Sequence, residues 1–383
     1  MISVDKAFEL IDQHRPNWGV ERIALAKANG RRLAENIVAP RDQPPHALVR
    51  MDGYAFRAED AEKDLNIIGE SRAGVPFLGS VSKQDAVRVF TGSVLPKGAD
   101  IVEMQENTDV INDTLKVSSV SKFRNFISPA GSDFKAGDLL FSSGEIVSAR
   151  MILSIATCNI ETVLVDRIPI IAFLPSGDEL RPLGSKLGPG QIVNSIAPSL
   201  IALLSDWGFT ALDLGIVTDR RGDISDKISQ ANADIIIPIG GASVGKYDHM
   251  KSVAVDLGFT PIFDKVAVKP GKPVWFSVRQ NTCILGLPGN PISAWVCTIL
   301  FLSKLLGREL KLKKAETREA IPENGIRETF LRATLTPDEK LECSDSQYSG
   351  LVLSFSKANA LVRRSSNAAP VMKGASVEFI YLD

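Results

Sequence analysis

The sequence predicts a multidomain α/β protein in which a central α/β sheet domain is joined to mostly β domains. At 383 residues the chain is longer than one ordinary hydrophobic core supports. From Pro169 onward, continuous apolar strands alternate with helices, a pattern typical of a largely parallel sheet with both faces covered. The regions before and after consist of short strands and turns, which we interpret as separate β domains.

The N-terminal part begins as a helix and continues as strands. Ser3 is a suitable cap for a helix that we expect to extend to about Ala28. Pro40 to Pro45 breaks the chain, and a region rich in glycine and β-branched residues follows to about Gly144. Its strand candidates are Val87–Phe90, Ile101–Val102 and Leu115–Val117.

The central part carries the strand-helix alternation. Strands are expected at Ile170–Leu174, Thr210–Val217, Ile235–Ile239, Ile262–Val268, Val274–Phe276 and Cys283–Leu285. Helices are expected at Ala197–Trp207, Ile224–Ala231, Asp248–Leu257 and Ile292–Leu306. After these elements, the charged run that begins with Lys311–Lys314 is interpreted as a linker. A small terminal β domain follows, with strands at Arg327–Leu335, Leu351–Phe355 and Val377–Leu382.

Composition excludes several classes of function. A formal net charge of -1 argues against a nucleic-acid partner, which demands concentrated positive charge. Three histidines argue against an imidazole-based zinc site. Four scattered cysteines without Cys-x-x-Cys spacing indicate a reduced, cytoplasmic compartment. The N-terminus lacks a signal-peptide pattern, and the most apolar stretch is too short to span a bilayer, so no membrane partner is expected.

Three glycine- and proline-rich loops beside apolar runs carry the functional signal. Gly240 and Gly241 follow a buried strand, and the backbone amides after them can face an anion, with Ser243 adding a hydroxyl. Such a pair is as often a structural turn as a phosphate cradle. The loop matches neither the Walker pattern nor the dinucleotide fingerprint, which disfavours P-loop and nicotinamide enzymes.

The other two loops offer cations and a helix start. Lys269–Pro273 places two ammonium groups on a stiff turn, which is either a solvated surface turn or a rigid oxyanion holder. Leu287–Pro291 precedes a helix whose first turn contains Ser293, and free amides at a helix start attract anions. Both loops follow strands of the predicted sheet, at whose carboxyl edge ligands bind.

Carboxylates follow other strands of the same sheet. Asp178 and Glu179 follow the first strand, Asp219 follows the next, and Asp248 closes the Gly-Gly loop, so that these acids are placed to hold a magnesium ion that bridges phosphate groups. Each could instead cap a helix, the commoner fate of a single aspartate at such a position. Upstream, Met51–Ala55 and Thr91–Asp100 are compact loops that physical reasoning alone assigns to turns of the β domain.

Five stretches in order along the chain resemble the molybdopterin molybdenumtransferases, the enzyme family related to the gephyrin E domain. They are Met51–Ala55, Thr91–Gly92 with Leu95–Asp100, Ser176–Leu180, Gly240–Gly245 with Asp248, and Lys269–Pro273 with Gly286–Pro291. Ser349–Gly350, Ser354 and Ala358–Asn359 also resemble the last domain of the family. The chain departs from the usual family pattern at Arg50, Ser128, Ile196 and Arg220.

The resemblance implies a homodimer whose subunit has four domains. These are an α/β molybdopterin-binding domain (1–20 and 169–308), a linking domain (21–39 and 138–168), a mostly β domain (40–137) and a C-terminal β-barrel (309–383). It also implies insertion of molybdate into the dithiolene of adenylylated molybdopterin, with magnesium, to give molybdenum cofactor and AMP. In the family, the site lies between the α/β domain of one subunit and the β domain of the other.

The resemblance also implies roles for individual residues and partners. By position, the acidic catalytic and magnesium residues are Glu179, Asp219 and Asp248, and the basic ones are Lys269 and Lys272. Asp52 and Thr91 complete the catalytic set from the β domain. Cofactor-binding residues are Gly240, Gly241, Ser243, Gly245, Pro288, Gly289, Asn290, Pro291 and Ser293. Protein partners would be the molybdopterin adenylyltransferase and the enzymes that receive the cofactor.

Three alternatives stay open at the level of sequence. The first is a molybdopterin-binding or carrier protein without catalysis, which would not release AMP from the adenylylated substrate. The second is an adenylyltransferase of the related single-domain family, whose Gly-Gly-Thr-Gly loop followed by Arg-Asp is absent here. The third is a scaffold role like that of gephyrin, for which the sequence names no partner.

Overall fold

The computed structural model describes residues 1–119, 126–241 and 249–382. The chain forms two compact units, Met1–Trp18 with Ile168–Asp383 and Gly19–Arg167, and each is described by itself. The predicted fold class, a multidomain α/β protein with mostly β domains and a terminal barrel, is confirmed. Within the described residues, no helix is long and apolar enough to cross a membrane.

The first unit is built on a six-stranded sheet. Its strand order is β16 (Ala211–Asp213), β13 (Ile171–Pro175), β17 (Ile235–Ile239), β21 (Thr282–Gly286), β20 (Trp275–Arg279) and β18 (Thr260–Phe263). The first four strands pair in parallel, and β20 pairs antiparallel with both of its neighbours, β21 and β18. A short parallel pair, β14 (Leu180–Arg181) and β15 (Ile192–Val193), lies outside this sheet.

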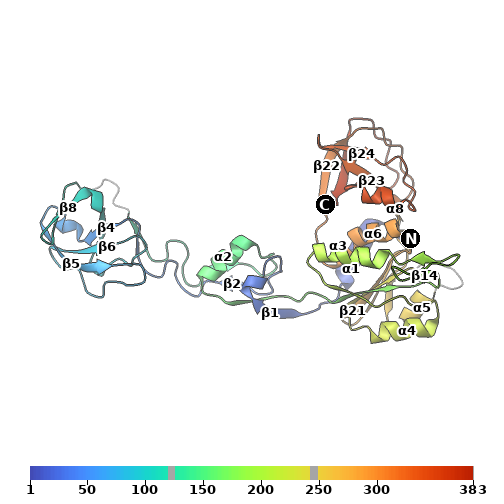
Figure 1. Ribbon diagram of the computed structural model, residues 1–383, viewed down its shortest axis with the longest axis horizontal. Coiled ribbons are helices and arrows are strands. Elements are labelled where there is room, and N and C mark those ends of the chain that lie inside the picture. The colour runs from blue at the N-terminus through green and yellow to red at the C-terminus, as the bar shows by residue number, and fades with distance from the viewer. Residues whose placement is uncertain (120–125, 242–248, 383) are drawn as a thin grey trace. The chain divides into compact units, whose positions relative to one another are not determined.

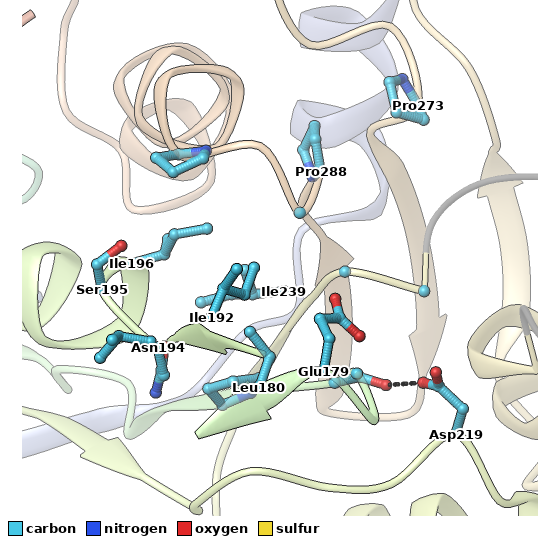
Figure 2. Close-up of a pocket in the computed structure, with 18 residues that line it drawn as sticks. Glu179, Leu180, Ile192, Asn194, Ser195, Ile196, Asp219, Ile239, Pro273 and Pro288 are labelled. Carbon is cyan, nitrogen blue, oxygen red and sulfur yellow. Dashed lines mark hydrogen bonds between the residues drawn. The ribbon is translucent and has the colours of Figure 1, made fainter. Parts of the chain in front are cut away.

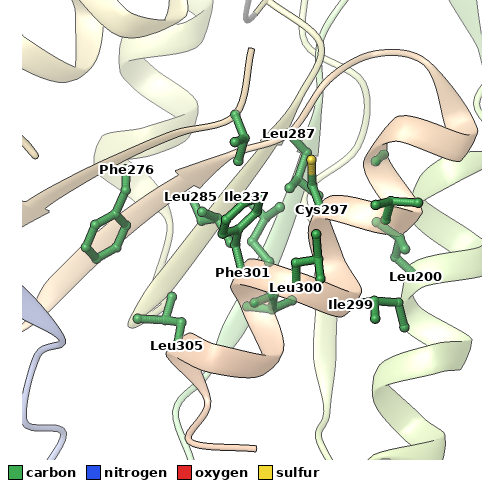
Figure 3. Close-up of a cluster of buried hydrophobic side chains, with 14 of the residues drawn as sticks. Leu200, Ile237, Phe276, Leu285, Leu287, Cys297, Ile299, Leu300, Phe301 and Leu305 are labelled. Atoms are coloured by element: carbon green, nitrogen blue, oxygen red, sulfur yellow. The ribbon is translucent and has the colours of Figure 1, made fainter. Parts of the chain in front are cut away.

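Helices cover both faces of this sheet, as the continuous apolar strands predicted (Figure 1). Ile235 and Ile237 of β17 join one buried cluster and Ile236 joins the other, because successive side chains of a strand point to opposite faces. The first cluster packs against α1 (Val4–His14), α3 (Ile196–Asp206) and α6 (Pro291–Cys297), which continues through a π-helical turn (Thr298–Leu302) into α7 (Ser303–Leu305) (Figure 3). The second packs against α4 (Arg221–Gln230) and α5 (Met250–Asp256).

The C-terminal part of this unit is a closed five-stranded barrel. The strand order is β19 (Val268–Lys269), β23 (Glu328–Leu335), β24 (Lys340–Cys343), β22 (Leu312–Thr317), β26 (Ser376–Tyr381) and β25 (Ala360–Arg364). Pairing of β23 with β25 closes the barrel. The parallel addition of β19 to β23 joins the loop of Lys269 to the barrel sheet.

The second unit contains one six-stranded sheet and several small pairings. The large sheet has the order β7 (Ile101–Met104), β4 (Gly53–Phe56), β6 (Asp85–Val89), β5 (Leu65–Ser71), β9 (Thr114–Val117) and β8 (Thr108–Ile111). The smaller pairs are β1 (Val20–Ala24) with β12 (Thr162–Asp166), β2 (Ile37–Val38) with β11 (Leu139–Phe141), and β3 (Leu48–Val49) with β10 (Ile127–Ser128). The described part of this unit also contains the helix α2 (Ala149–Thr157) and the short 3-10 turns η1 (Leu25–Lys27), η2 (Ala58–Asp60) and η3 (Gln105–Asn107).

Several expected elements differ in the structure; the expected strand Ile262–Val268, for example, is divided between β18 and β19, which belong to different sheets. The first helix ends at His14, because Pro16 cannot continue it, and Val20–Ala24 is a strand. Of the expected linker at Lys311–Lys314, the residues from Leu312 onward belong to strand β22. The expected strand Leu351–Phe355 is instead the short helix α8 (Val352–Ser356), in which Phe355 packs edge-on against Trp295 at 5.3 Å between ring centroids.

Candidate active site

The carboxyl edge of the parallel sheet carries two of the predicted acids. The Ser176 amide donates to the Ile239 carbonyl at 2.9 Å, which holds the turn after β13 against the end of β17. The Ser176 hydroxyl donates to Oδ1 of Asp219 at 2.9 Å (Figure 2). This bond fixes the half-buried Asp219 carboxylate at the sheet edge and leaves Oδ2 for another partner.

Glu179 reaches the same edge through the turn at Gly177. A Cβ at Gly177 would lie 2.6 Å from Oε2 of Glu179, so the glycine makes room for that carboxylate. In the view of Figure 2, the carboxylates of Glu179 and Asp219 lie on the same side of a pocket. Both side chains offer carboxylate oxygens as ligands, which suit a hard cation such as magnesium.

The third predicted acid, Asp248, lies outside the described residues, as do Ser243 and Gly245. Among the residues that the structure describes, no group of three His, Cys, Asp or Glu side chains is arranged to hold a metal ion. Glu179 and Asp219 are thus the two described members of the predicted magnesium set.

We call the cavity beside these acids the acid-edged pocket; it has a volume of about 420 Å³. Glycines line its floor, where there is little room for side chains. A Cβ at Gly240 would lie 2.6 Å from the Ser176 carbonyl oxygen, and one at Gly289 would lie 3.4 Å from the Gly240 Cα atom. Gly240 also has φ +93°, a conformation that favours glycine. The glycines predicted from sequence therefore let two loops pack backbone to backbone under the pocket.

Apolar side chains and prolines form the remaining walls of the acid-edged pocket. They include Leu180, Ile192, Ile239 and Pro288. On the side away from the acids, Asn194, Ser195 and Ile196 stand at the start of α3 (Figure 2). A cavity with apolar walls and a few polar groups at its ends suits a flat, partly polar ring system.

Lys269 and Lys272 line a second cavity of about 530 Å³, which we call the cationic pocket. Both lysines are exposed, and in the described part of the chain neither has an ion pair. Pairing of β19 with β23 brings Arg327 and Arg332 of the barrel to the same cavity. None of the described residues that line it carries a carboxylate, so the pocket is electropositive.

The two pockets share a wall. Pro273 lines both, and the first turn of α6 lies between them, with Pro291 on the acid-edged side and Ser293 on the cationic side. Asn290 caps this helix, because its Oδ1 accepts from the Ser293 amide at 3.2 Å and from the Ser293 hydroxyl at 3.3 Å. The Ser293 amide that was expected to attract an anion is therefore already used within the helix.

In the second unit, Asp52 and Thr91 form a hydrogen-bonded pair. Oδ1 of Asp52 accepts from the Thr91 amide at 2.8 Å and from its hydroxyl at 2.7 Å. These two hydrogen bonds lower the pKa of the Asp52 carboxyl below its ordinary range, and the bond from the Thr91 backbone amide has the larger effect. Beside them, the Arg88 guanidinium stacks on the Tyr54 ring, 4.8 Å from its centroid.

Three family models match the chain one after another. They are the MoeA N-terminal region (domain I and II) over residues 2–159, a probable molybdopterin binding domain over 172–308, and the MoeA C-terminal region (domain IV) over 314–382. A molybdopterin molybdenumtransferase of Nostoc sp. is 32% identical over 378 residues, which cover 92% of this chain and 87% of that relative. The chain belongs to the molybdopterin molybdenumtransferase family. The resemblance that five sequence motifs carried is thereby confirmed.

Other members of the molybdopterin molybdenumtransferase family agree. The Haemophilus influenzae enzyme of that name is 33% identical over 314 residues, or 80% of this chain and 78% of the relative. The crystal structure of a molybdopterin biosynthesis MoeA protein from Pyrococcus horikosii superposes with a TM-score of 0.87 at 28% identity, covering 100% of this chain and 99% of that one. The family is one of transferases in molybdenum cofactor biosynthesis.

Sequence reasoning did not assign several residues that line the two pockets of this family member. Ser176, Asn194 and Ser195 line the acid-edged pocket, and Arg327 and Arg332 line the cationic one. Asn194 and Ser195 could have been found, since they directly precede a helix at the sheet edge. The two arginines carry no local signal, because only the β19–β23 pairing brings them to the lysines.

Proposed function

We propose that this chain is a molybdopterin molybdenumtransferase that inserts molybdate into the dithiolene of adenylylated molybdopterin and releases AMP. The observation that carries the proposal is the pair of pockets on either side of Pro273. One has apolar walls and an acidic edge, and the other is electropositive. The two adjacent cavities would therefore suit two substrates of different chemistry, a pterin conjugate in one and a small oxyanion in the other.

The acid-edged pocket is proposed to hold the adenylylated molybdopterin. Its apolar walls suit the ring systems, and the carboxylates of Glu179 and Asp219 would hold the cation that a diphosphate needs. Bound magnesium would neutralise phosphate charge on the leaving AMP. Asp219, oriented by Ser176, and Glu179 would hold that ion together with waters and substrate oxygens, since magnesium seldom takes all its ligands from protein.

The cationic pocket is proposed to bind molybdate. Lys269 and Lys272 flank a turn bounded by Pro270 and Pro273, so the two ammonium groups need little ordering when an oxyanion arrives. The absence of a carboxylate among its described lining residues favours a dianion over a cation. The shared wall at Pro273 supports direct transfer from this pocket to the dithiolene.

The protein is further proposed to act as a cytoplasmic homodimer in which Asp52 and Thr91 act on substrate held by the other subunit. Several large apolar side chains among the described residues of the second unit, including Val20, Leu139, Ile146 and Leu153, are at least half exposed in the single chain. Apolar side chains of this size are those that subunit contacts bury. All four cysteines are free, in keeping with a reducing compartment.

The deciding experiment is release of AMP from adenylylated molybdopterin in the presence of magnesium, with and without molybdate. Molybdate-dependent release is expected from the wild type, and loss of roughly 100-fold or more in Lys269→Ala and Asp219→Asn. Lys265→Ala, a surface lysine paired with Asp264 at 4.0 Å, is the control and should stay active. Tight binding of the adenylylated substrate without AMP release would instead establish a carrier protein.

A further inference from the structure

The lysine loop (residues 269–273) packs closely against helix α6 at Gly271. A Cβ atom added at Gly271 would lie 2.4 Å from the Sγ atom of Cys297, far inside van der Waals distance. The Cys297 thiol also donates to the Gly271 carbonyl oxygen, with 3.5 Å between sulfur and oxygen. The thiol therefore occupies the space beneath this glycine and contacts its backbone directly.

Helix geometry explains why this contact falls on Cys297. Ser293 and Cys297 are four residues apart in α6 and lie on one face of the helix. The same Cβ position at Gly271 lies 3.7 Å from the Ser293 carbonyl oxygen. Gly271 thus packs across one helical turn, and both Gly271 and Ser293 line the cationic pocket.

Cys297 belongs to the main buried cluster of the first unit (Figure 3). Burial raises the pKa of its thiol, so at neutral pH the group keeps the proton that it donates to Gly271. Cys283 in β21 is equally buried, belongs to the same cluster, and also has a raised pKa. In the described part of the chain, however, the Cys283 thiol has no hydrogen bond.

We propose that Cys297 is a positioning residue for oxyanion binding: its thiol fixes Gly271, and through it the ammonium groups of Lys269 and Lys272 on either side. The identity of the oxyanion as molybdate rests on the proposed function. The Gly271 carbonyl also accepts from the Val274 amide at 3.1 Å, so thiol and amide together define the plane of this peptide. Removing the sulfur lets the peptide settle toward α6 and moves both lysines.

The test compares Cys297→Ala, Cys297→Ser and the matched control Cys283→Ala in the full-length protein. Molybdate binding is measured by calorimetry, and the KM values for molybdate and for adenylylated molybdopterin are measured separately. Cys297→Ala should raise the Kd and KM for molybdate by roughly tenfold, because misplacing a binding group by about 1 Å can cost up to a hundredfold. The KM for adenylylated molybdopterin should change little. Cys297→Ser, which keeps a donor at this position, should restore most of the affinity.

Measurements of thermal stability distinguish a loss of loop positioning from general damage to core packing. Cys297→Ala and Cys283→Ala each delete one buried sulfur and should lower the Tm by a similar few degrees. Only Cys297→Ala should weaken molybdate binding. Equal Kd changes in both alanine variants, a serine variant no better than alanine, or a wild type that binds no molybdate would each overturn the inference. A wild type that binds molybdate but releases no AMP would overturn the proposed function alone.

Discussion

The Asp52 carboxyl stays ionised at lower pH than an ordinary aspartate, because both hydrogen bonds from Thr91 stabilise the carboxylate. A depressed pKa contributes stability above the ordinary value of 3.8, and this stability is lost as the pH falls through the lower folded value. Thr91→Val removes the hydroxyl bond and should move the pKa of Asp52 back upward. Thr91→Ser keeps the hydroxyl and should leave it low. Carbon-detected NMR titration of the Asp52 carboxyl measures both, and equal pKa values in the two variants would contradict the hydroxyl bond.

Gly53, next to Asp52 in the sequence, shows how one missing Cβ permits a strand pairing. A Cβ at Gly53 would lie 1.9 Å from the Glu103 carbonyl oxygen of the neighbouring strand β7. Gly53→Ala should therefore destabilise the protein by about 3 kcal/mol or more. Gly222→Ala in helix α4 meets no atom within 4 Å and should instead stabilise it by about 0.5 kcal/mol. Chemical denaturation measures both changes, and equal midpoints would refute the strand contact.

Local chemistry predicted some single-residue features and could not predict others. Ser3 was predicted as a cap, and its hydroxyl accepts from the Lys6 amide at 3.1 Å, because capping depends only on neighbours in sequence. The contact between Gly271 and Cys297 joins residues 26 positions apart and exists only once β19 and α6 are packed. No periodicity or composition in the sequence carries that contact.

At the level of elements, two substitutions of Asn290 can distinguish the stability of helix α6 from the effect of charge beside the pockets. Its side chain accepts from the Ser293 amide, and its neighbours Gly289 and Pro291 line the acid-edged pocket. Asn290→Ala should lower the free energy of unfolding by about 1 kcal/mol, because the cap is lost. Asn290→Asp keeps a capping oxygen but adds negative charge, so its Tm should stay near wild type while the KM for the anionic pterin substrate rises. An Asn290→Asp variant with wild-type KM would show that this charge does not reach the substrate.

The elements that sequence predicted well are those with one simple environment. Strand β17 is apolar at every position and buried throughout, so its pattern was sufficient. Strand β22 was missed because its lysines are exposed, which is typical of a linker; the Lys313 ammonium lies over the Tyr381 ring, 5.0 Å from its centroid. Helix α8 was missed because packing of Phe355 against Trp295 overrides an apolar run typical of a strand.

At the level of the whole molecule, the cationic pocket contains residues that the order of motifs along the sequence cannot predict. The two lysines were predicted, but the two arginines opposite them belong to the barrel, more than fifty positions later in the chain. Pairing of Val268 with Glu328 and of Lys269 with Thr329 brings the two segments together. Such long-range pairing is decided by the packed barrel and leaves no trace in either segment alone.

The proposed dimer makes a prediction that single variants cannot test. If Asp52 of one subunit acts on substrate held by Lys269 of the other, a mixed dimer of Asp52→Asn and Lys269→Ala chains has one intact site and one doubly altered site. Co-expressed with two affinity tags and purified as the mixed species, it should retain about half of the wild-type AMP release, although each parent dimer is inactive.

The matched control for this experiment is a mixed dimer of Lys269→Ala and Lys272→Ala chains. Both lysines belong to the same loop, so every site in this dimer lacks one of them and activity should stay at the level of the parents. Recovery in the first mixed dimer and not in the second would mean that the two units contribute to a site from different chains. Inactivity of both would mean that each chain supplies its own Asp52, and the exposed apolar side chains of the second unit would then need another role.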